Sequence, residues 1–254
     1  MKRTALITGA TSGLGYEFVK LFAKDGYDLV LIARNKQKLE DIKQSFTNIQ
    51  VTVMAIDLSV SGAAKEVFQE LEKKEIDIDV LVNNAGFGLM GKFDELDIHK
   101  QIEMIQLNIT ALTELTYYFL PGLKRNNRGR ILNVASTAAF QPGPLMAVYY
   151  ATKSFVLSFS EALVEELKGS SVTVTTLCPG PTKTNFGFIA NVEKTKMFSR
   201  AMSSDIVAQK GYEAMMNGKR VIVTGGGNKA GVLGAKFLPR SLAAKIAMYV
   251  AGEK

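Results

Sequence analysis

The sequence predicts an α/β domain built on a doubly wound parallel sheet, and two patterns carry that prediction. Short apolar runs rich in Val, Ile and Leu alternate with longer segments of helical periodicity. Continuous apolar runs of this kind are typical of strands that are buried on both faces of a parallel sheet. A glycine-rich turn directly follows the first run, which is where such sheets bring the backbone close to a ligand.

Seven apolar runs are the predicted strands of the sheet. They are Arg3–Thr8, Asp28–Ala33, Val51–Ile56, Val80–Asn83, Arg130–Ala135, Val172–Cys178 and Arg220–Thr224. Strands and helices alternate without a break, which indicates right-handed βαβ units. We therefore expect a single domain over residues 1–254, without a linker or an internal repeat.

Apolar residues at helical spacing predict the helices between these strands. The first helix starts near Leu14 and stops at Gly26, a residue type that often ends helices. The next well-defined helix covers residues 60–71, and either Ser59 or Ser61 is expected to cap its N-terminus.

Two longer helices are expected at Ile98–Arg125 and Met146–Lys168, and Pro121 should end or bend the first of them. The segment Asn185–Ser204 has no clear period and follows the sixth predicted strand. An irregular segment at the carboxyl edge of such a sheet is a candidate lid over a bound ligand.

The composition is that of an ordinary water-soluble enzyme. The chain has 254 residues, of which 47% are hydrophobic and 22% are charged, and this length suffices to bury a full core. No apolar stretch is long enough to span a bilayer. The apolar run at the N-terminus is too short for a signal peptide and leads into the glycine turn. We therefore expect a cytoplasmic protein without a transmembrane segment.

The single cysteine and the single histidine restrict the chemistry. Cys178 cannot form an internal disulfide, and His99 alone cannot build a multi-histidine metal site. A Ser–His–Asp triad is disfavoured because no Gly-x-Ser-x-Gly elbow is present. Both residues are expected to be structural, and no metal site is predicted. Tyr, Lys, Ser and carboxylate side chains remain as candidates for catalysis.

The net charge of +7 raises the alternative of a nucleic-acid or anionic-membrane partner. The basic residues are scattered, however, and no cluster of Lys and Arg is interleaved with aromatic residues. A basic enzyme that binds a polyanionic dinucleotide accounts better for the charge, so no nucleic-acid partner is expected.

The turn after the first strand reads Thr8-Gly9-Ala10-Thr11-Ser12-Gly13-Leu14-Gly15. A sharp strand-to-helix turn needs glycine where φ is positive, and further glycines let the backbone approach a pyrophosphate and pack against the strand. The helix N-terminus then offers free amides to the phosphates. A purely structural glycine turn is the alternative.

The ends of the second and third strands bear on the choice of cofactor. An NAD enzyme usually carries Asp or Glu after its second strand, whereas this strand ends in Ala33-Arg34-Asn35. Arg34 can pair with a 2′-phosphate, so NADP(H) is expected over NAD(H); a solvated arginine is the alternative. Asp57 is placed to accept a hydrogen bond from the adenine amino group, or else it serves only in a turn.

Tyr149 and Lys153 are four residues apart in one predicted helix, so they share a face. The ammonium of Lys153 near the phenol should lower the pKa of Tyr149 and suit it to general acid–base catalysis. Ser136 ends the fifth strand, where its hydroxyl can polarise a substrate oxygen. The adjacent Tyr150 should face elsewhere and serve in packing.

At this point the chain resembles the short-chain dehydrogenase/reductase (SDR) family over nearly its whole length. The matching pieces, in family order and spacing, are Thr8–Gly15, Asp57-Leu58, Asn83-Asn84-Ala85-Gly86, Asn108, Ser136, Tyr149-x-x-x-Lys153 and Pro179–Thr184. The resemblance implies a Rossmann-type fold with a seven-stranded parallel sheet, and a homodimer or homotetramer built on the two long helices.

The resemblance also implies roles for individual residues. Asn108 would hold a water that links Lys153 to solvent, and Asn84 with its Ala-Gly turn would line the adenosine ribose side. The loop 179–184 would contact the nicotinamide carboxamide. The expected cofactor-binding residues are Gly9, Thr11, Ser12, Gly13, Leu14, Gly15, Arg34, Asp57, Leu58, Asn84, Ala85, Gly86, Tyr149, Lys153, Pro179, Gly180, Thr182 and Thr184.

The chain departs from the family pattern at one place and imitates it at another. Ser12 stands where many NADP-preferring relatives carry a basic residue, so the NADP preference depends on Arg34. The segment Val223–Gly227 resembles a second dinucleotide loop. Too little chain follows it for a βαβ unit, and we interpret it as the last strand plus a turn.

The expected reaction reduces a hydrophobic ketone or aldehyde, or oxidises the corresponding alcohol. The residues expected on the substrate side are Phe140, Leu145, Met146, Phe186, Phe188 and Met197, although ordinary core positions are an equal alternative. The alternative hypothesis is a non-catalytic NADP sensor or scaffold on the same fold.

The segment Leu238–Val250 reads as a short amphipathic helix. It could cover a subunit partner, close the substrate cavity or contact a membrane surface. Packing on its own domain is favoured over peripheral membrane contact.

Overall fold

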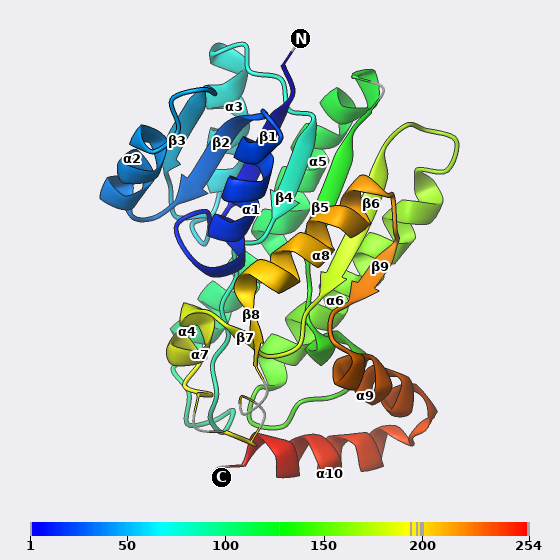
Figure 1. Cartoon of the computed structure of the whole chain (residues 1–254). Helices are drawn as coiled ribbons and strands as arrows, with labels where there is room; N and C mark the ends of the chain where they lie inside the picture. The colour runs from blue at the N-terminus through cyan, green and yellow to red at the C-terminus, as the bar shows by residue number, and fades with distance from the viewer. Residues whose placement is uncertain (1, 127, 194, 197, 199–200, 253–254) are drawn as a thin grey trace.

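A seven-stranded parallel sheet forms the centre of the computed structural model (Figure 1). The strands are β1 (Thr4–Thr8), β2 (Asp28–Ala33), β3 (Val51–Ala55), β4 (Val80–Asn83), β5 (Arg130–Val134), β6 (Thr173–Cys178) and β9 (Val221–Val223), in the spatial order β3-β2-β1-β4-β5-β6-β9. All seven predicted strands are confirmed, and no boundary differs by more than one residue. The structure describes residues 2–126, 128–193, 195–196, 198 and 201–252.

Helices cover both faces of the sheet. One face carries α1 (Gly13–Lys24), α2 (Lys36–Gln44) and α8 (Ser204–Met216), and the other carries α3 (Ala63–Lys73), α5 (Leu112–Arg125) and α6 (Ala147–Glu166). The remaining helices are α4 (Ile98–Ile105), α7 (Asn185–Ile189), α9 (Gly226–Phe237), α10 (Arg240–Ala251), the π-helix η1 (Gln106–Ala111) and the 3₁₀ helix η2 (Thr137–Phe140). The short strands β7 (Thr182–Lys183) and β8 (Met202–Ser203) pair with each other.

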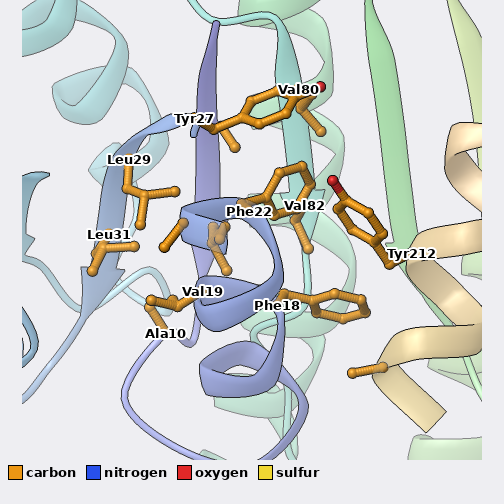
Figure 2. Close-up of a cluster of buried hydrophobic side chains, with 14 of the residues drawn as sticks. Ala10, Phe18, Val19, Phe22, Tyr27, Leu29, Leu31, Val80, Val82 and Tyr212 are labelled. Carbon is orange, nitrogen blue, oxygen red and sulfur yellow. The ribbon is translucent and has the colours of Figure 1, made fainter. Parts of the chain in front are cut away.

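The strands supply a separate hydrophobic core to each face because successive side chains alternate in direction. In β1, Ala5 and Ile7 join the core under α1 and α8, and Leu6 joins the core under α3 and α5. Figure 2 shows Phe22 of α1 packed between strand residues and Tyr212 of α8. Burial of this kind is the dominant stabilising term for such a domain.

The expected N-cap of the helix after the third strand is wrong, and one of the two alternatives for Pro121, that it ends its helix, is excluded. Helix α3 begins after Gly62, whose φ of +84° makes it the N-cap, and neither Ser59 nor Ser61 caps it. Ser59 instead donates its hydroxyl to Asp57 Oδ1 at 2.6 Å, which holds it in a turn. Pro121 does not end α5, which runs on to Arg125.

The helical stretch Ile98–Arg125 is interrupted by a π-helical segment, which the sequence did not predict. Helix α4 ends at Ile105, η1 continues as a π-helix over Gln106–Ala111, and α5 resumes at Leu112. A π-segment inserts extra chain into a helix and is frequently found at functional sites. Asn108 lies within it and is buried.

The topology creates a crevice beside β1. The chain proceeds outward from β1 to β2 and β3, and then α3 crosses over to β4 on the other side of β1. Loops that leave the carboxyl ends of β1 and β4 therefore diverge, and ligands bind in such a gap. Beyond β9, a turn at Gly225 leads into α9. The interpretation of 223–227 as the last strand plus a turn is therefore only partly correct, because Gly226 and Gly227 are the first residues of α9.

Within the described residues, none of the helices combines the length and the apolar character that crossing a bilayer requires.

Candidate active site

A cavity of about 550 Å³ lies beyond the carboxyl ends of the central strands. Most of the residues expected at the cofactor line it: Gly9, Thr11, Ser12, Gly13, Leu14, Arg34, Asp57, Leu58, Asn84, Ala85, Gly86, Tyr149, Lys153, Pro179, Gly180, Thr182 and Thr184. Two expected site residues, Gly15 and Asn108, are absent from this lining and lie behind the wall. The size is within the range of known small-molecule sites, about 300–1,000 Å³.

The glycine turn forms a cradle that only glycine permits. Gly9 has a φ of +67°, in the left-handed region, and a Cβ on Gly15 would lie 2.1 Å from the Gly9 carbonyl oxygen. Ser12 then begins α1 without using its side chain as a cap. The first amides of α1 are thus directed toward the cavity, and this arrangement fits a pyrophosphate.

Thr8 and Asn84 hold this turn in place. The Thr8 hydroxyl accepts hydrogen bonds from the backbone amides of Asn84 and Ala85 at 3.0 and 2.9 Å, and it donates to the Val82 carbonyl at 3.2 Å. The Asn84 side chain donates to the Thr8 carbonyl at 2.9 Å. Thr8, which joins the ends of β1 and β4 across the crevice, was not assigned a role of its own from the sequence.

Tyr149 and Ser136 meet at the inner end of the cavity. Tyr149 is only 8% exposed, and its phenol is hydrogen-bonded to the Ser136 side chain. Burial raises the pKa of Tyr149 above its ordinary value, and the bond with Ser136 offsets that rise only in part. The prediction that Lys153 lowers the pKa of Tyr149 is therefore wrong. The phenol keeps its proton over the working pH range, which suits a proton donor.

Lys153 is buried beneath the tyrosine. Its Nζ donates to the Val134 carbonyl at 2.9 Å and lies 5.9 Å from the centre of the Tyr149 ring. Burial lowers the pKa of Lys153 to about 8. The predicted shared face of the two side chains is thus observed, with the ammonium near the phenol ring but bonded to the end of β5.

Asn108 fixes the wall behind Lys153. Its amide donates to the Phe87 carbonyl at 3.0 Å and to the Thr152 hydroxyl at 3.1 Å, and its Oδ1 accepts from the Phe87 backbone amide at 3.2 Å. A Cβ on Gly86 would meet Asn108 Oδ1 at 2.9 Å and Lys153 Nζ at 3.5 Å. The π-segment thereby brings Asn108 close to Lys153 across Gly86.

Arg34 lies at the opposite, open end of the cavity. Its side chain is 68% exposed, and its Nη1 is 3.8 Å from Glu103 Oε1. Asp57, nearby, accepts from the backbone amide and the hydroxyl of Ser59 at 3.0 and 2.6 Å. Burial acts against ionisation of Asp57, but the Ser59 bonds and the cations Arg34 and Lys100 hold its pKa below the ordinary value.

Two charged residues at this end were missed in the sequence. Lys100 and Glu103 of α4 both line the cavity, and Glu103 Oε2 accepts from Lys100 Nζ at 2.5 Å. Glu103 therefore contacts both cations, Arg34 and Lys100. The two cations come from chain segments more than sixty residues apart, and only the fold brings them together.

The apolar part of the cavity differs from the expected substrate side. Met146 and Phe186 line it as expected, whereas Phe140 and Leu145 are absent from the lining and Phe188 is 78% exposed. Met197 lies outside the described residues. The apolar side chains that were missed are Phe87, Leu89, Leu107, Ile189, Val192 and Phe198. They come from loops and short segments, in which no hydrophobic periodicity indicates where a side chain points.

Tyr150 also differs in part from expectation. Its ring packs tightly on Gly143, in keeping with a packing role, but one edge borders the cavity. Cys178 is buried, which raises the pKa of its thiol to about 12. Among the described residues, no group of three His, Cys, Asp or Glu side chains is placed to hold a metal ion.

A doubly wound sheet with a glycine cradle at its carboxyl edge defines a Rossmann-type protein. Comparison with known proteins narrows this class. The family model for short chain dehydrogenases matches residues 3–194. The chain belongs to the short-chain dehydrogenase/reductase family and is an oxidoreductase.

Relatives and solved structures agree with this assignment. An uncharacterized oxidoreductase of Staphylococcus epidermidis is 32% identical over 179 residues, 70% of this chain and 77% of that protein. The very-long-chain 3-oxoacyl-CoA reductase of Homo sapiens is 30% identical over 224 residues, 84% of this chain and 70% of that protein. A short-chain dehydrogenase from Sphingobium yanoikuyae, solved in complex with NADPH, has a TM-score of 0.81 and 29% identity, covering 92% of this chain and 93% of the other.

Proposed function

We propose that this protein is an NADP(H)-dependent oxidoreductase that interconverts a hydrophobic ketone or aldehyde and its alcohol. The observation that carries the proposal is the convergence of Tyr149, Ser136 and Lys153 at the inner end of a cavity whose mouth carries Arg34. This arrangement suits a dinucleotide that would lie along the carboxyl edge of the sheet, with its reactive end beside the phenol.

The proton chemistry is assigned to the buried group at the inner end. The nicotinamide, when bound, supplies or accepts the hydride. Tyr149 donates its proton to the carbonyl oxygen during reduction and withdraws it during oxidation. Ser136 donates a hydrogen bond to the same oxygen. Lys153, as an ammonium, stabilises the phenolate that forms, and Asn108 positions the wall behind it.

The cofactor contacts follow from the shape and charge of the cavity. The glycine cradle and the α1 amides would hold the pyrophosphate, and the loop Pro179–Thr184, which contributes to the cavity lining, would contact the nicotinamide. A Cβ on Gly13 would lie 3.0 Å from the Thr184 side chain, so the loop and the cradle nearly touch. Arg34 and Lys100 pair with a 2′-phosphate. A 29% identical relative that was solved with NADPH supports the same choice.

The substrate class rests on the apolar lining and on relatives. Phe87, Met146 and Phe186 border the space next to Tyr149, and the Phe186 ring is 5.3 Å from the tyrosine ring. No Arg lines this inner part of the described cavity, which argues against a carboxylate clamp. Relatives named as very-long-chain 3-oxoacyl-CoA reductases support reduction of an acyl ketone. The described part of 185–204 supplies Phe186, Ile189, Val192 and Phe198 to this lining, and we propose that it closes over the space as a lid. Residues 194, 197, 199 and 200 of the predicted lid lie outside the described residues.

The test begins with cofactor binding and proceeds to turnover. Purified protein is titrated with NADPH and with NADH while the fluorescence of the reduced nicotinamide is followed. A panel of hydrophobic ketones and aldehydes is then screened for loss of cofactor absorbance. We expect tighter binding of NADPH and turnover of at least one carbonyl compound. Binding without turnover across the panel would favour the sensor reading, and absence of binding would refute the proposal.

A further inference from the structure

Helix α9 has no buried residue, which is unusual for a helix of 12 residues in a folded domain. It contains Gly226, Gly227, Gly231 and Gly234, and glycine weakens a helix by about 1 kcal/mol per residue relative to alanine. Most helical stability in proteins comes from the packing of an apolar face. Helix α9 is therefore expected to have a packing partner outside the chain. Figure 1 shows that α9 lies beyond the end of β9 and that α10 runs back across the bottom of the molecule.

The next helix, α10, has an inner face and an apolar outer face. Ala243, Ala247 and Ala251 are buried, at intervals of four residues, and hold the helix against the domain. The outer stripe is formed by Leu242, Ile246 and Tyr249, at helical spacing. The large exposed apolar side chains of α9, α10 and their connection are Leu233, Phe237, Leu238, Leu242, Ile246, Met248 and Tyr249, with Phe237 83% and Tyr249 70% exposed.

The charge of this segment has one sign. Residues 226–252, here named the basic strap, contain Lys229, Lys236, Arg240 and Lys245 and no Asp or Glu. All four cationic residues are exposed. Exposed apolar side chains interspersed with cations and without acids are typical of helices that lie in the interface of an anionic membrane.

The positive charge also favours an anionic membrane over a second copy of the chain as the partner of the basic strap. A two-fold symmetric interface brings the same patch of both copies together. Pairing of two basic straps would therefore place eight cations in one contact without a carboxylate from either strap, and like charges disfavour such a contact. A bilayer with anionic headgroups offers an apolar region to the outer stripe and negative charge to the cations.

We propose that the basic strap docks the protein flat on the surface of a bilayer that contains anionic phospholipid. Phe237 and Ile246 enter the apolar boundary of the lipid, and the lysines meet the headgroups. This inference does not depend on the catalytic assignment, because vesicle binding is measured without substrate or cofactor.

The strap also contacts segments at the border of the cavity. Lys236 lies 5.7 Å from the ring of Phe140, which belongs to the turn that follows Ser136. Lys196, in the proposed lid, lies 4.2 Å from the Tyr249 ring and donates its backbone amide to the Gly252 carbonyl at 3.5 Å. A docked strap would therefore hold the lid side of the cavity near the membrane, where apolar substrates dissolve.

The experiment is flotation of the full chain with vesicles of phosphatidylcholine alone and of phosphatidylcholine mixed with phosphatidylglycerol. We expect binding to the anionic vesicles to exceed binding to the neutral ones by at least about tenfold and to weaken in high salt. Phe237→Ser with Ile246→Ser should reduce binding on the order of tenfold, as should Lys229→Gln with Lys245→Gln. All four positions are exposed, so the thermal unfolding midpoints should stay close to that of the wild type.

Matched controls lie far from the strap in the sequence. Phe93 is 62% exposed, and Lys65 is exposed on α3. Phe93→Ser and Lys65→Gln should leave vesicle binding unchanged. The proposal is overturned if wild-type protein does not float with either vesicle, if it binds both equally, or if the controls weaken binding as much as the strap variants. Dissociation of an oligomer by Phe237→Ser with Ile246→Ser, measured by sedimentation, would instead assign the strap to a second copy.

Discussion

The two ends of the cavity differ in how deeply their functional side chains are buried. At the inner end, Tyr149 is hydrogen-bonded to Ser136 and Lys153 to the end of β5, and burial is the largest influence on the pKa values of Tyr149 and Lys153. At the outer end, Arg34 and Lys100 are more than half exposed and share one carboxylate. Charge interactions among exposed groups are weak and screened by salt, whereas those among buried groups are not.

The difference teaches which substitutions should be severe. A group at the inner end works through its protonation state, so one atom decides its function. A group at the outer end works through the sum of several charges, so that each contributes a share. The four predictions below run from the inner end outward, and from the largest expected effect to the smallest.

Tyr149→Phe removes the proton that is transferred and should lower turnover by about 10²–10⁴-fold. NADPH affinity, measured by fluorescence, should change little because the pyrophosphate and 2′-phosphate contacts remain. Tyr150→Phe is the matched control, since it removes a hydroxyl from the neighbouring residue and should retain activity. A Tyr149→Phe enzyme with wild-type turnover would eliminate the acid–base role.

Turnover should fall as the pH rises through about 8, the pKa of Lys153. Burial lowers this pKa, so the ammonium predominates below pH 8 and is lost progressively above it, while Tyr149 keeps its proton because its pKa is raised. The rate of carbonyl reduction, measured from about pH 6 to about pH 10, should show this inflection. NADPH binding is measured at each pH as the control.

The isosteric variant Lys153→Met identifies the group behind that inflection. It should be slower throughout and lack the decline near pH 8. A wild-type profile that stays flat to about pH 10 would remove the ammonium from the mechanism, and an inflection retained in Lys153→Met would assign it to another group.

Arg34→Asp should lower the ratio of NADPH to NADH affinity by at least about tenfold, because repulsion of the 2′-phosphate replaces attraction. Lys100→Gln should lower the same ratio about threefold, since it removes one charge that is more than half exposed. Lys38→Gln, an exposed lysine on α2 outside the cavity lining, is the control. An unchanged ratio in Arg34→Asp would show that Arg34 is merely solvated.

Glu103→Gln should have the smallest effect and the opposite sign. It removes the carboxylate that contacts Arg34 and Lys100, so NADPH should bind about two- to threefold more tightly, with NADH little affected. Titration at low and high salt checks the cause, because a charge effect of this kind shrinks as salt is added. Weaker NADPH binding would mean that Glu103 positions the two cations for the phosphate.

The sheet and the inner end were readily predicted from the sequence. Strands buried on both faces, such as β2, appear as apolar runs whose limits coincide with the observed ones. Tyr149 and Lys153 could be predicted for a similar reason, because a spacing of four residues in one helix places both side chains on the same face. In both cases a local pattern determines the geometry.

The outer end was predicted only in part because its geometry is not local. Arg34 follows β2, but Lys100 and Glu103 reach it from α4, and no pattern in either segment refers to the other. The N-cap at Gly62 was missed because Ser59, one of the two expected capping residues, instead donates its hydroxyl to Asp57 in a turn. The apolar lining from loops, such as Phe87 and Val192, likewise depends on tertiary packing alone.

The π-helical segment around Asn108 has a consequence for how this chain tolerates changes in length. Loops on the surface accept gained or lost residues, since their ends can adjust. Deleting one residue between Gln106 and Ala111 would let the two flanking helices join as one regular α-helix, because a π-turn holds one residue more than an α-turn. The apolar side of α5 would keep its direction, but the bulge that carries Asn108 would be lost, so the extra residue is expected to matter for the site more than for the core.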